Sequence, residues 1–385
     1  MFAKLKNRHA YLLIIISLAA IIVRGFFINY ESGDYLLFLS EWCEHLERSE
    51  GFKGILTVDA DYNAIYLYFL ALFTYLPFDY LYSIKALSII FDFVMAVSAY
   101  LLVGQIMVDS EKRKEYSLMA YGAVLFIPTV ILNSSYWAQC DSIYAAFIFL
   151  SLYFMLKKKY NTCFILYGVA LTFKLQAIFF LPVYGIIYLK NRDFSIFKFG
   201  WAAVVNFILF IPAMIIGKPI TSILDAYTTQ VGKYGYKTVF GYPNVYNFMP
   251  IHAVQLNKPG IVFTMCLLMI LMLIVLFTKG KLDKYGIMEL GITVVLLVTY
   301  FLPEMHDRYG YLAEVLSVIY LIVRRRNVLA VVLINLCALI TYIMCLWGFA
   351  ENLIWIVSIV QFVPVFIFTK QFIQERFSER KETVN

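Results

Sequence analysis

The stretch YNAIYLYFLALFTYLP, residues 62–77, decides how the rest of the chain is threaded. It resembles a membrane span, but it holds only about a dozen apolar residues, whereas a span needs about 20. If it crossed the membrane, every later loop would change sides and the basic loops would face outward. That outcome contradicts the excess of Lys and Arg expected on the cytoplasmic side. The sequence therefore predicts an interfacial or re-entrant helix here, inside a first outer loop at 30–82.

The composition outside this stretch is that of a polytopic membrane protein. Of the 385 residues, 62% are hydrophobic and only 15% are charged, and the mean hydropathy is +0.77. Soluble domains carry about 25% charged residues, so the composition excludes a soluble enzyme. The net charge of +7 does not indicate nucleic-acid binding, because the basic residues fall in short clusters between apolar runs. A basic N-terminus precedes the first apolar run with no small-residue cleavage site, which predicts an uncleaved first span.

Apolar runs predict an all-α bundle of about twelve transmembrane helices in one integral membrane domain, 1–385. The predicted spans lie near 10–29, 83–107, 117–132, 142–156, 162–173, 177–189, 199–216, 259–278, 286–302, 311–323, 327–347 and 352–369. The gaps alternate between basic segments, such as EKRKEY and KGKLDK, and segments rich in other polar residues. The basic gaps are predicted to be cytoplasmic, as are both termini. The second set, with a long outer loop at 217–258, is predicted to face outward.

The first outer loop opens with ESGDY, which supplies a candidate general base. Glu31 and Asp34 are three residues apart and share a face if the segment is helical. Gly33 allows the backbone to approach a ligand closely. The following run, LLFLSEWCEHLE, repeats apolar residues at helical period and is predicted to lie on the membrane surface. The alternative interpretation of Asp34 is a helix cap.

A second candidate segment, NSSYWAQCDSIY, opens the fourth span. Trp137, Gln139 and Asp141 are the aromatic and hydrogen-bonding types that line sugar sites. Asp141 also stands where it would serve as the N-cap of the helix. Both interpretations remain open at the level of sequence.

Two further outer segments carry polar or aromatic residues. In LTFKLQAIFFLP, Lys174 and Gln176 lie between short apolar runs, where the lysine either holds a phosphate or extends to the interface. The long loop contains YGYKTVFGYPNVYNFMP, residues 234–250, and Asn244 within it is a candidate acceptor ligand. This loop forms either an acceptor pocket or lid, or an aromatic belt at the membrane surface.

The segment FLPEMHDRYGY, residues 301–311, packs an imidazole and a guanidinium among acids. Arg308 offers bidentate donors and His306 donates a hydrogen bond or a proton, so both are candidate phosphate ligands, with Tyr309 beside them. The alternative is an ion pair with Glu304 or Asp307. Within the second predicted span, Lys85 and Asp92 are seven residues apart on one face and predict a structural polar network.

The arrangement resembles the glycosyltransferases of the C superfamily (GT-C), which use polyprenyl-phosphate sugars. The closest branch is the bacterial mannosyltransferase-like one, related to glycosylphosphatidylinositol mannosyltransferases and dolichol-linked glucosyltransferases. The matching strings are SGDYLLFLSEW, WAQCDSIYAAFIFLSLYFMLKKK, LTFKLQAIFFLPV and FLPEMHDRYGY. With the span pattern, they cover nearly the whole chain. One departure is Tyr62-Asn63-Ala64 at the end of the first loop, where such sequences often carry Y-P-P.

The resemblance implies an outer-facing site with Asp34 as general base, although Glu31, Asp59 and Asp61 are alternatives. It implies Asp141 as a second acid near the acceptor or sugar, and Lys174, Gln176, His306, Arg308 and Tyr309 as donor-phosphate ligands. The expected partners are a polyprenyl-phosphate sugar, a glycan or glycolipid acceptor and membrane lipid, with no nucleic acid. No cofactor is expected, and a divalent metal is neither required nor ruled out. The expected location is a bacterial plasma membrane; the competing functions are a lipid-linked sugar flippase or transporter and a polysaccharide polymerase.

Overall fold

The computed structural model describes residues 2–224, 227, 236–250 and 253–382, and helices dominate this part of the chain. Seven described helices are long and apolar enough to cross a membrane, or eight if one bent pair counts as a single span. The fold thus fits an all-α, multi-pass membrane protein. A helix lies at each of the twelve predicted positions, but several are short, so length and composition do not confirm twelve crossings.

The described chain divides into two compact units. The first unit runs to Leu175 and includes the segment that begins at Trp201; the second takes Gln176–Gly200 and the chain from Tyr227 onward. Hydropathy shows where apolar segments lie, but it does not show which of them pack together.

The first unit consists of long helices and a group of short helical elements, in which η marks a 3-10 or π-helical segment. Its elements are α1 (Phe2–Gly25), η1 (Tyr35–Leu39), α2 (Ser40–Arg48), η2 (Gly51–Leu56), α3 (Ala64–Phe73), α4 (Tyr80–Ile106), α5 (Arg113–Phe126), α6 (Pro128–Ile131), η3 (Leu132–Tyr136), α7 (Asp141–Leu156), α8 (Tyr160–Phe173) and α10 (Gly200–Ile215).

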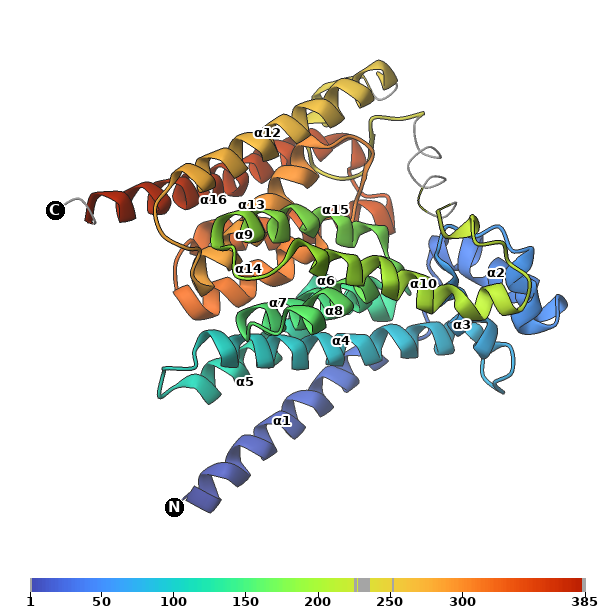
Figure 1. Ribbon diagram of the computed structural model, residues 1–385. Coiled ribbons are helices and arrows are strands. Elements are labelled where there is room, and N and C mark those ends of the chain that lie inside the picture. Colours follow the sequence, from blue (N-terminus) through green and yellow to red (C-terminus); the bar gives the residue numbers. More distant parts are fainter. Residues whose placement is uncertain (1, 225–226, 228–235, 251–252, 383–385) are drawn as a thin grey trace. The chain divides into compact units, whose positions relative to one another are not determined.

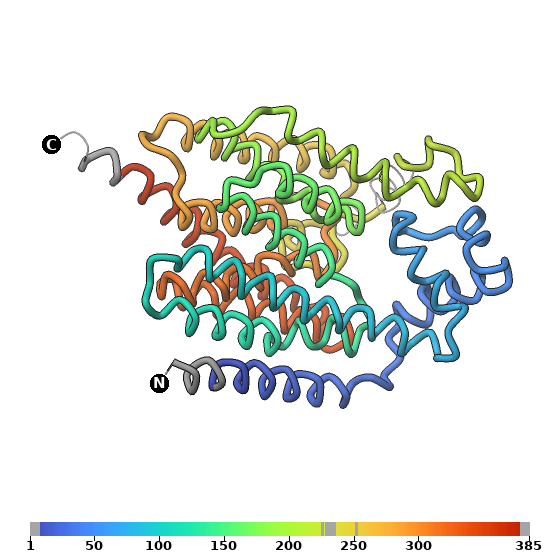
Figure 2. The backbone as a smooth tube through the Cα atoms, turned by 60° about the horizontal axis from the view of Figure 1, so that its bottom comes forward, coloured from blue at the N-terminus to red at the C-terminus, as the bar shows by residue number. Residues whose placement is uncertain are grey.

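Helix α4 is the central element of this unit. It packs along both α5 and α7, and α7 packs along α8, so these four helices form one layer of neighbours (Figures 1 and 2). Its N-terminus is capped by Asp79, whose side chain accepts a hydrogen bond from the backbone nitrogen of Leu81 at 2.7 Å. Apolar contacts between the facing helix stripes supply the packing energy, at about 25 cal/mol per Å² of buried apolar surface.

The predicted non-crossing segment forms α3, which has only ten residues. At about 1.5 Å rise per residue, such a helix spans half of a hydrocarbon core about 30 Å thick. The helix does not lie alone on a surface, because Tyr66, Leu67 and Leu70 are buried against α2, η2 and α4. The segment 30–82 therefore contributes to an apolar core that it shares with α4, α7 and α8.

The helix pair α5 and α6 is broken by Pro128. Proline has no backbone N–H and clashes with the preceding turn, so a helix ends or bends before it. Here α5 ends at Phe126, and the axis turns by 55° into the short helical segment 128–136. After the bend, η3 leads directly into the loop that carries Trp137 and Gln139.

The second unit contains the remaining helices and one small pair of strands. Its elements are η4 (Leu175–Phe180), α9 (Leu181–Asn191), η5 (Ile196–Phe199), β1 (Val239–Phe240), η6 (Val245–Phe248), η7 (Val254–Leu256), α12 (Asn257–Phe277), α13 (Lys284–Phe301), β2 (Met305–His306), α14 (Tyr311–Arg324), α15 (Val328–Trp347), η8 (Glu351–Leu353) and α16 (Ile354–Glu382).

Helix α13 is the most buried candidate span of this unit and packs against α9, α12, α14 and α16. Strands β1 and β2 pair in parallel, with Val239 opposite Met305 and Phe240 opposite His306. The expectation of an all-α fold missed this pairing, because two-residue strands have no period to detect. The pairing joins the long loop to the segment 301–311.

Candidate functional site

Asp34 is the centre of the polar cluster in the first unit. Trp137 Nε1 donates to Asp34 Oδ2 at 3.0 Å, and Gln139 Nε2 donates to the same oxygen at 2.6 Å. Asp34 precedes η1, and its side chain engages these two donors rather than capping the helix. Its carboxylate is half-buried. The structure therefore brings together the acid of ESGDY and the loop WAQCD, which lie more than 100 residues apart.

Unusual backbone conformations lie on both sides of this contact. The π-helix η1 starts immediately after Asp34, and the π-helix η3 ends immediately before Trp137. Ala138 adopts a left-handed conformation with φ of 64° although it is fully buried. That conformation costs roughly 1–2 kcal/mol for a residue with a Cβ. It turns the chain so that Trp137 and Gln139 both reach one carboxylate oxygen, and such local strain and π-bulges cluster at functional sites.

Ser32 and Tyr62 are members of the site that the sequence analysis did not assign. The Ser32 hydroxyl donates to the Trp137 carbonyl at 2.7 Å and accepts from the Tyr35 backbone nitrogen at 3.2 Å. The Tyr62 hydroxyl donates to Gln139 Oε1 at 3.5 Å. In the sequence, Ser32 stands immediately before Gly33-Asp34. A serine in such a place indicates a turn that its hydroxyl stabilises. The only sequence signal at Tyr62 was its place as the first residue of Tyr62-Asn63-Ala64, the departure from Y-P-P.

Trp137 contributes its N–H rather than its face. Only 2% of the residue is exposed, so its ring is not open to a sugar, as the sequence-based interpretation required. Half-buried aromatic rings nearby belong instead to Trp42 and Tyr62, which meet edge to face at 5.9 Å between centroids. A buried indole N–H normally finds an acceptor, and Asp34 supplies it.

Asp141 lies beside this cluster in a buried ion pair. Lys174 Nζ is 2.5 Å from Asp141 Oδ1, and Asn133 Nδ2 donates to Asp141 Oδ2 at 2.8 Å. The carboxylate and the ammonium are 1% and 7% exposed. The N-cap interpretation is wrong, because Cys140 is the N-cap and Asp141 is the first residue of α7. The predicted phosphate ligand Lys174 is engaged with this carboxylate.

The alternative bases of the first loop are placed differently. Glu31 and Asp59 are exposed, and Asp61 is half-buried. Glu31 precedes the helical turn, so it does not share a helix face with Asp34 as the three-residue spacing suggested. Asp34 is the acid that receives the Trp137 and Gln139 donors.

In the second unit, the segment 301–311 forms a compact polar turn. The His306 ring stacks on Phe240 at 4.7 Å between centroids, and its backbone belongs to β2. Arg308 Nη1 is 3.6 Å from Asp307 Oδ1, so the expected ion pair with an acidic neighbour is present. His306 and Arg308 remain half-buried rather than enclosed. The turn presents an imidazole and a guanidinium within three residues of each other.

Glu304 anchors this turn to α12. Asn257 Nδ2 donates to Glu304 Oε1 at 2.7 Å, and Glu304 has a left-handed φ of 63°. Burial raises the pKa of the Glu304 carboxyl above its ordinary value, an effect that the Asn257 hydrogen bond opposes. Glu304 therefore supports the backbone of the turn, whereas Asp307 pairs with Arg308.

The other predicted site residues of this unit are Asn244, Gln176 and Tyr309. Asn244 is fully buried; its Oδ1 accepts from the Tyr246 backbone nitrogen at 3.0 Å, which caps η6. Gln176 is 8% exposed in η4, and Tyr309 packs near the His306 ring at 5.1 Å. Tyr242 and Tyr246 are buried, so they do not form a surface belt. Residues 225–226, 228–235 and 251–252 of the long loop lie outside the described residues.

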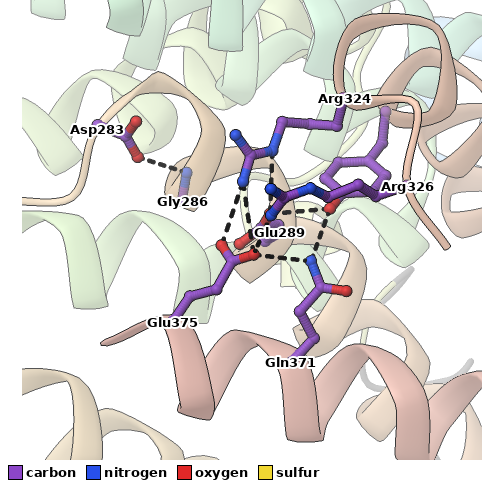
Figure 3. Close-up of polar contacts among 8 residues, drawn as sticks. Asp283, Gly286, Glu289, Arg324, Arg326, Gln371 and Glu375 are labelled. Carbon is purple, nitrogen blue, oxygen red and sulfur yellow. Dashed lines mark hydrogen bonds and ion pairs between the residues drawn. The ribbon is translucent and has the colours of Figure 1, made fainter. Parts of the chain in front are cut away.

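The sequence analysis missed a charged cluster in the second unit, which Glu289, Arg324, Arg326 and Glu375 form (Figure 3). Arg324 and Arg326 both reach Glu375, at 3.4 Å and 3.1 Å, and Gln371 Nε2 donates to Glu375 Oε1 at 3.0 Å. Arg324 also approaches the buried Glu289 at 3.7 Å. The cluster joins α13, α14 and α16 and balances two carboxylates against two guanidinium groups.

Within the described parts of the chain, no group of three or more His, Cys, Asp or Glu side chains is placed to hold a metal ion. No protein-family model matches the sequence, and a comparison with curated proteins finds no match.

Proposed function

We propose that the chain is an integral membrane glycosyltransferase of the GT-C type. It transfers a monosaccharide from a polyprenyl-phosphate donor to a glycan or glycolipid acceptor. The observation that carries the proposal is the half-buried Asp34 carboxylate, held by the Trp137 and Gln139 N–H groups of the loop WAQCD. A carboxylate fixed by two donors at the edge of an apolar bundle has the placement required of a general base.

In the proposed reaction, Asp34 accepts the proton of an acceptor hydroxyl as its oxygen attacks the anomeric carbon. The bond from that carbon to the phosphate oxygen breaks, and the polyprenyl phosphate leaves with the electron pair. Attack opposite the leaving group inverts the anomeric centre. Positioned base catalysis contributes about 10²–10⁴-fold in rate.

The resemblance assigns leaving-group stabilisation to the polar turn within residues 301–311. Arg308 and His306 are half-buried donors, and developing phosphate charge is stabilised most strongly by such preorganised groups. Tyr309 and Gln176 belong to the same proposed donor-binding set. We assign Lys174 a different task, because its ammonium already neutralises Asp141 in the first unit.

The membrane arrangement is also part of the proposal. Twelve crossings would place both termini and the basic loops in the cytoplasm and Asp34 on the outer face, in a bacterial plasma membrane. Shorter helices such as α7 and α8 would complete their crossings with flanking residues. Cysteine accessibility of Asp59→Cys compared with Lys158→Cys in sealed vesicles checks the sidedness.

The functional test uses purified protein in nanodiscs with radiolabelled polyprenyl-phosphate monosaccharides and a crude glycolipid acceptor fraction. We expect wild type and Asp34→Asn to bind the same donor, and only wild type to transfer the sugar. Asp59→Asn, a change of the same kind in the same loop, should retain transfer. Unchanged transfer by Asp34→Asn would move the base elsewhere. Failure of every monophosphate donor to bind would favour a polymerase or flippase that uses lipid-diphosphate oligosaccharides.

A further inference from the structure

Helix α4 carries a buried polar face that the proposed reaction does not use. Lys85, Ser88 and Asp92 are 0% exposed, within a helix apolar enough to cross a membrane. Ionisable groups inside such a helix are costly and mark function by default. Lys85 and Asp92 do not pair with each other; each contacts a different segment that leads to the candidate site.

Asp92 joins the two chain segments from which the site is built. Its Oδ2 accepts from Arg24 Nε at 2.8 Å and from the Ser134 hydroxyl at 2.5 Å. Arg24 lies in the last turn of α1, ten residues before Asp34. Ser134 lies in η3, three residues before Trp137. One carboxylate oxygen therefore fixes the origins of both segments.

Arg24 also stabilises the break at Pro128. Its Nη1 donates to the carbonyl of Leu125 at 3.1 Å, near the end of α5. The bend removes the helical partner of that carbonyl, which then needs another donor in an apolar environment. The bend directs η3 towards the candidate site. Arg24 therefore stabilises the bent path of the chain and also pairs with the Asp92 carboxylate.

Lys85 holds the first of the two segments directly. Its Nζ donates to the carbonyls of Phe27, Ile28 and Tyr30, at 3.0, 3.0 and 2.5 Å. These carbonyls follow the end of α1, where the helix no longer supplies N–H donors to its carbonyls and a cation is favourable. The ammonium thus fixes the path of the chain towards Asp34.

Beyond Lys85 and Asp92, the two segments contact each other at three successive places. Tyr30 stacks on Tyr136 at 3.6 Å between ring centroids, with an interplanar angle of 16°. The next contact is the bond from the Ser32 hydroxyl to the Trp137 carbonyl. The last is the pair of bonds from Trp137 and Gln139 to Asp34. Asp92 and Lys85 lie at the base of this series, and Asp34 lies at its end.

We infer that Asp92, with Arg24 and Lys85, positions Asp34 and the Trp137–Gln139 loop against each other. They are positioning residues, because they act through the segments 27–34 and 134–139. The inference rests on the proposed function only for its activity measurement; the geometry can be tested without any substrate. Misplacement of a catalytic group by 1 Å costs about 100-fold in rate.

The test replaces the ion pair with apolar side chains in Arg24→Met/Asp92→Leu. Replacement of both members of a buried ion pair by hydrophobic residues is often neutral or stabilising, so the thermal midpoint should be retained. The first readout is the ¹⁵N-bound indole proton of Trp137 in nanodiscs, identified by its loss in Trp137→Phe. Asp34→Asn gives its position without the carboxylate acceptor. The second readout is sugar transfer.

We expect the Trp137 signal of the double variant to move towards its position in Asp34→Asn. Transfer should fall about 100-fold in kcat with donor KM unchanged, and adding Asp34→Asn should abolish the transfer that remains. The control is His9→Phe, which removes another polar contact between α1 and α4, to Tyr100 at 3.1 Å. It should leave both readouts unchanged.

A wild-type Trp137 signal in the double variant would overturn the inference and make the ion pair purely structural. Wild-type transfer with a displaced signal would also refute it, because the displacement would then have no catalytic consequence. If no variant, wild type included, transfers sugar, the proposed function fails while the Trp137 signal still decides the geometry. Should the double variant not fold, Ser134→Ala removes only the link to η3 and should shift the same signal in the same direction.

Discussion

Replacing Lys174 by Met should destabilise the first unit by about 3–5 kcal/mol, because it leaves Asp141 as a buried charge without its cation. The ammonium is 2.5 Å from Asp141 Oδ1, and the two side chains are 7% and 1% exposed. Methionine preserves most of the apolar stem, so little of the loss comes from packing. The hydrogen bond from Asn133 remains, but a neutral amide does not balance a carboxylate.

The assay is equilibrium or thermal unfolding of purified protein in one detergent, and the structure offers a matched control. Lys53 is also 2.5 Å from a carboxylate, that of Glu50, but both side chains are 72% exposed. Lys53→Met should therefore leave stability unchanged, since exposed pairs contribute little. The double variant Lys174→Met/Asp141→Leu removes both charges and should recover most of the loss.

A stability of Lys174→Met equal to that of Lys53→Met would contradict a stabilising buried ion pair, and so would a double variant as unstable as the single one. The same variants test the earlier interpretation of Lys174 as a phosphate ligand. A phosphate ligand predicts weaker donor binding at unchanged stability. The ion pair predicts lost stability, with donor binding restored in the double variant.

Three further outcomes follow from individual contacts. Gln139→Leu removes one charge-assisted donor to Asp34, worth about 1.5–3 kcal/mol, and should slow transfer roughly 10- to 100-fold in steady-state assays, whereas equal rates would show that the bond is not used. Because burial raises the folded-state pKa of Glu304 above its ordinary value of 4.5, the folded state binds its proton more tightly than the unfolded state. Stability should therefore decline as pH rises above about 4.5, and Glu304→Gln should remove that part of the decline in unfolding curves from pH 4 to 7. Glu375→Gln should cost about 1 kcal/mol at low salt and less at high salt, because Arg326 is largely exposed; a salt-independent loss would contradict an electrostatic origin.

The helix positions and the short helix at 64–73 were predictable because hydropathy and charge bias act locally. Length alone does not separate α3, with ten residues, from a predicted span such as α9, with eleven; the Lys and Arg pattern of the later loops makes that distinction in the prediction. The two-unit division was not predictable, since it depends on which apolar stripes pack together. The strand pair β1–β2 was not predictable either, because two residues are too few for an alternating pattern.

The expected polar network at Lys85 and Asp92 is present, but its partners come from other elements. Seven residues along an α-helix place two side chains on one face but about 10.5 Å apart along the axis, too far for an ion pair. Each residue therefore needed partners from other elements, and the structure supplies Arg24 for Asp92 and three backbone carbonyls for Lys85. Arg24 was hidden inside the first apolar run, where a single basic residue did not alter the prediction of a span.

The contact at the heart of the candidate site depends on features that sequence patterns do not reveal. The sequence analysis offered the ring of Trp137 to a sugar, but a tryptophan has both a face for stacking and an N–H that must be satisfied when buried. Burial of the ring decides between the two: the N–H is directed at Asp34, and the left-handed Ala138 lets Gln139 reach the same oxygen. A carboxylate oxygen held by two donors from one rigid loop has little rotational freedom. The strain at Ala138 is thus offset by the fixed orientation of the acid, and this orientation is what a general base requires.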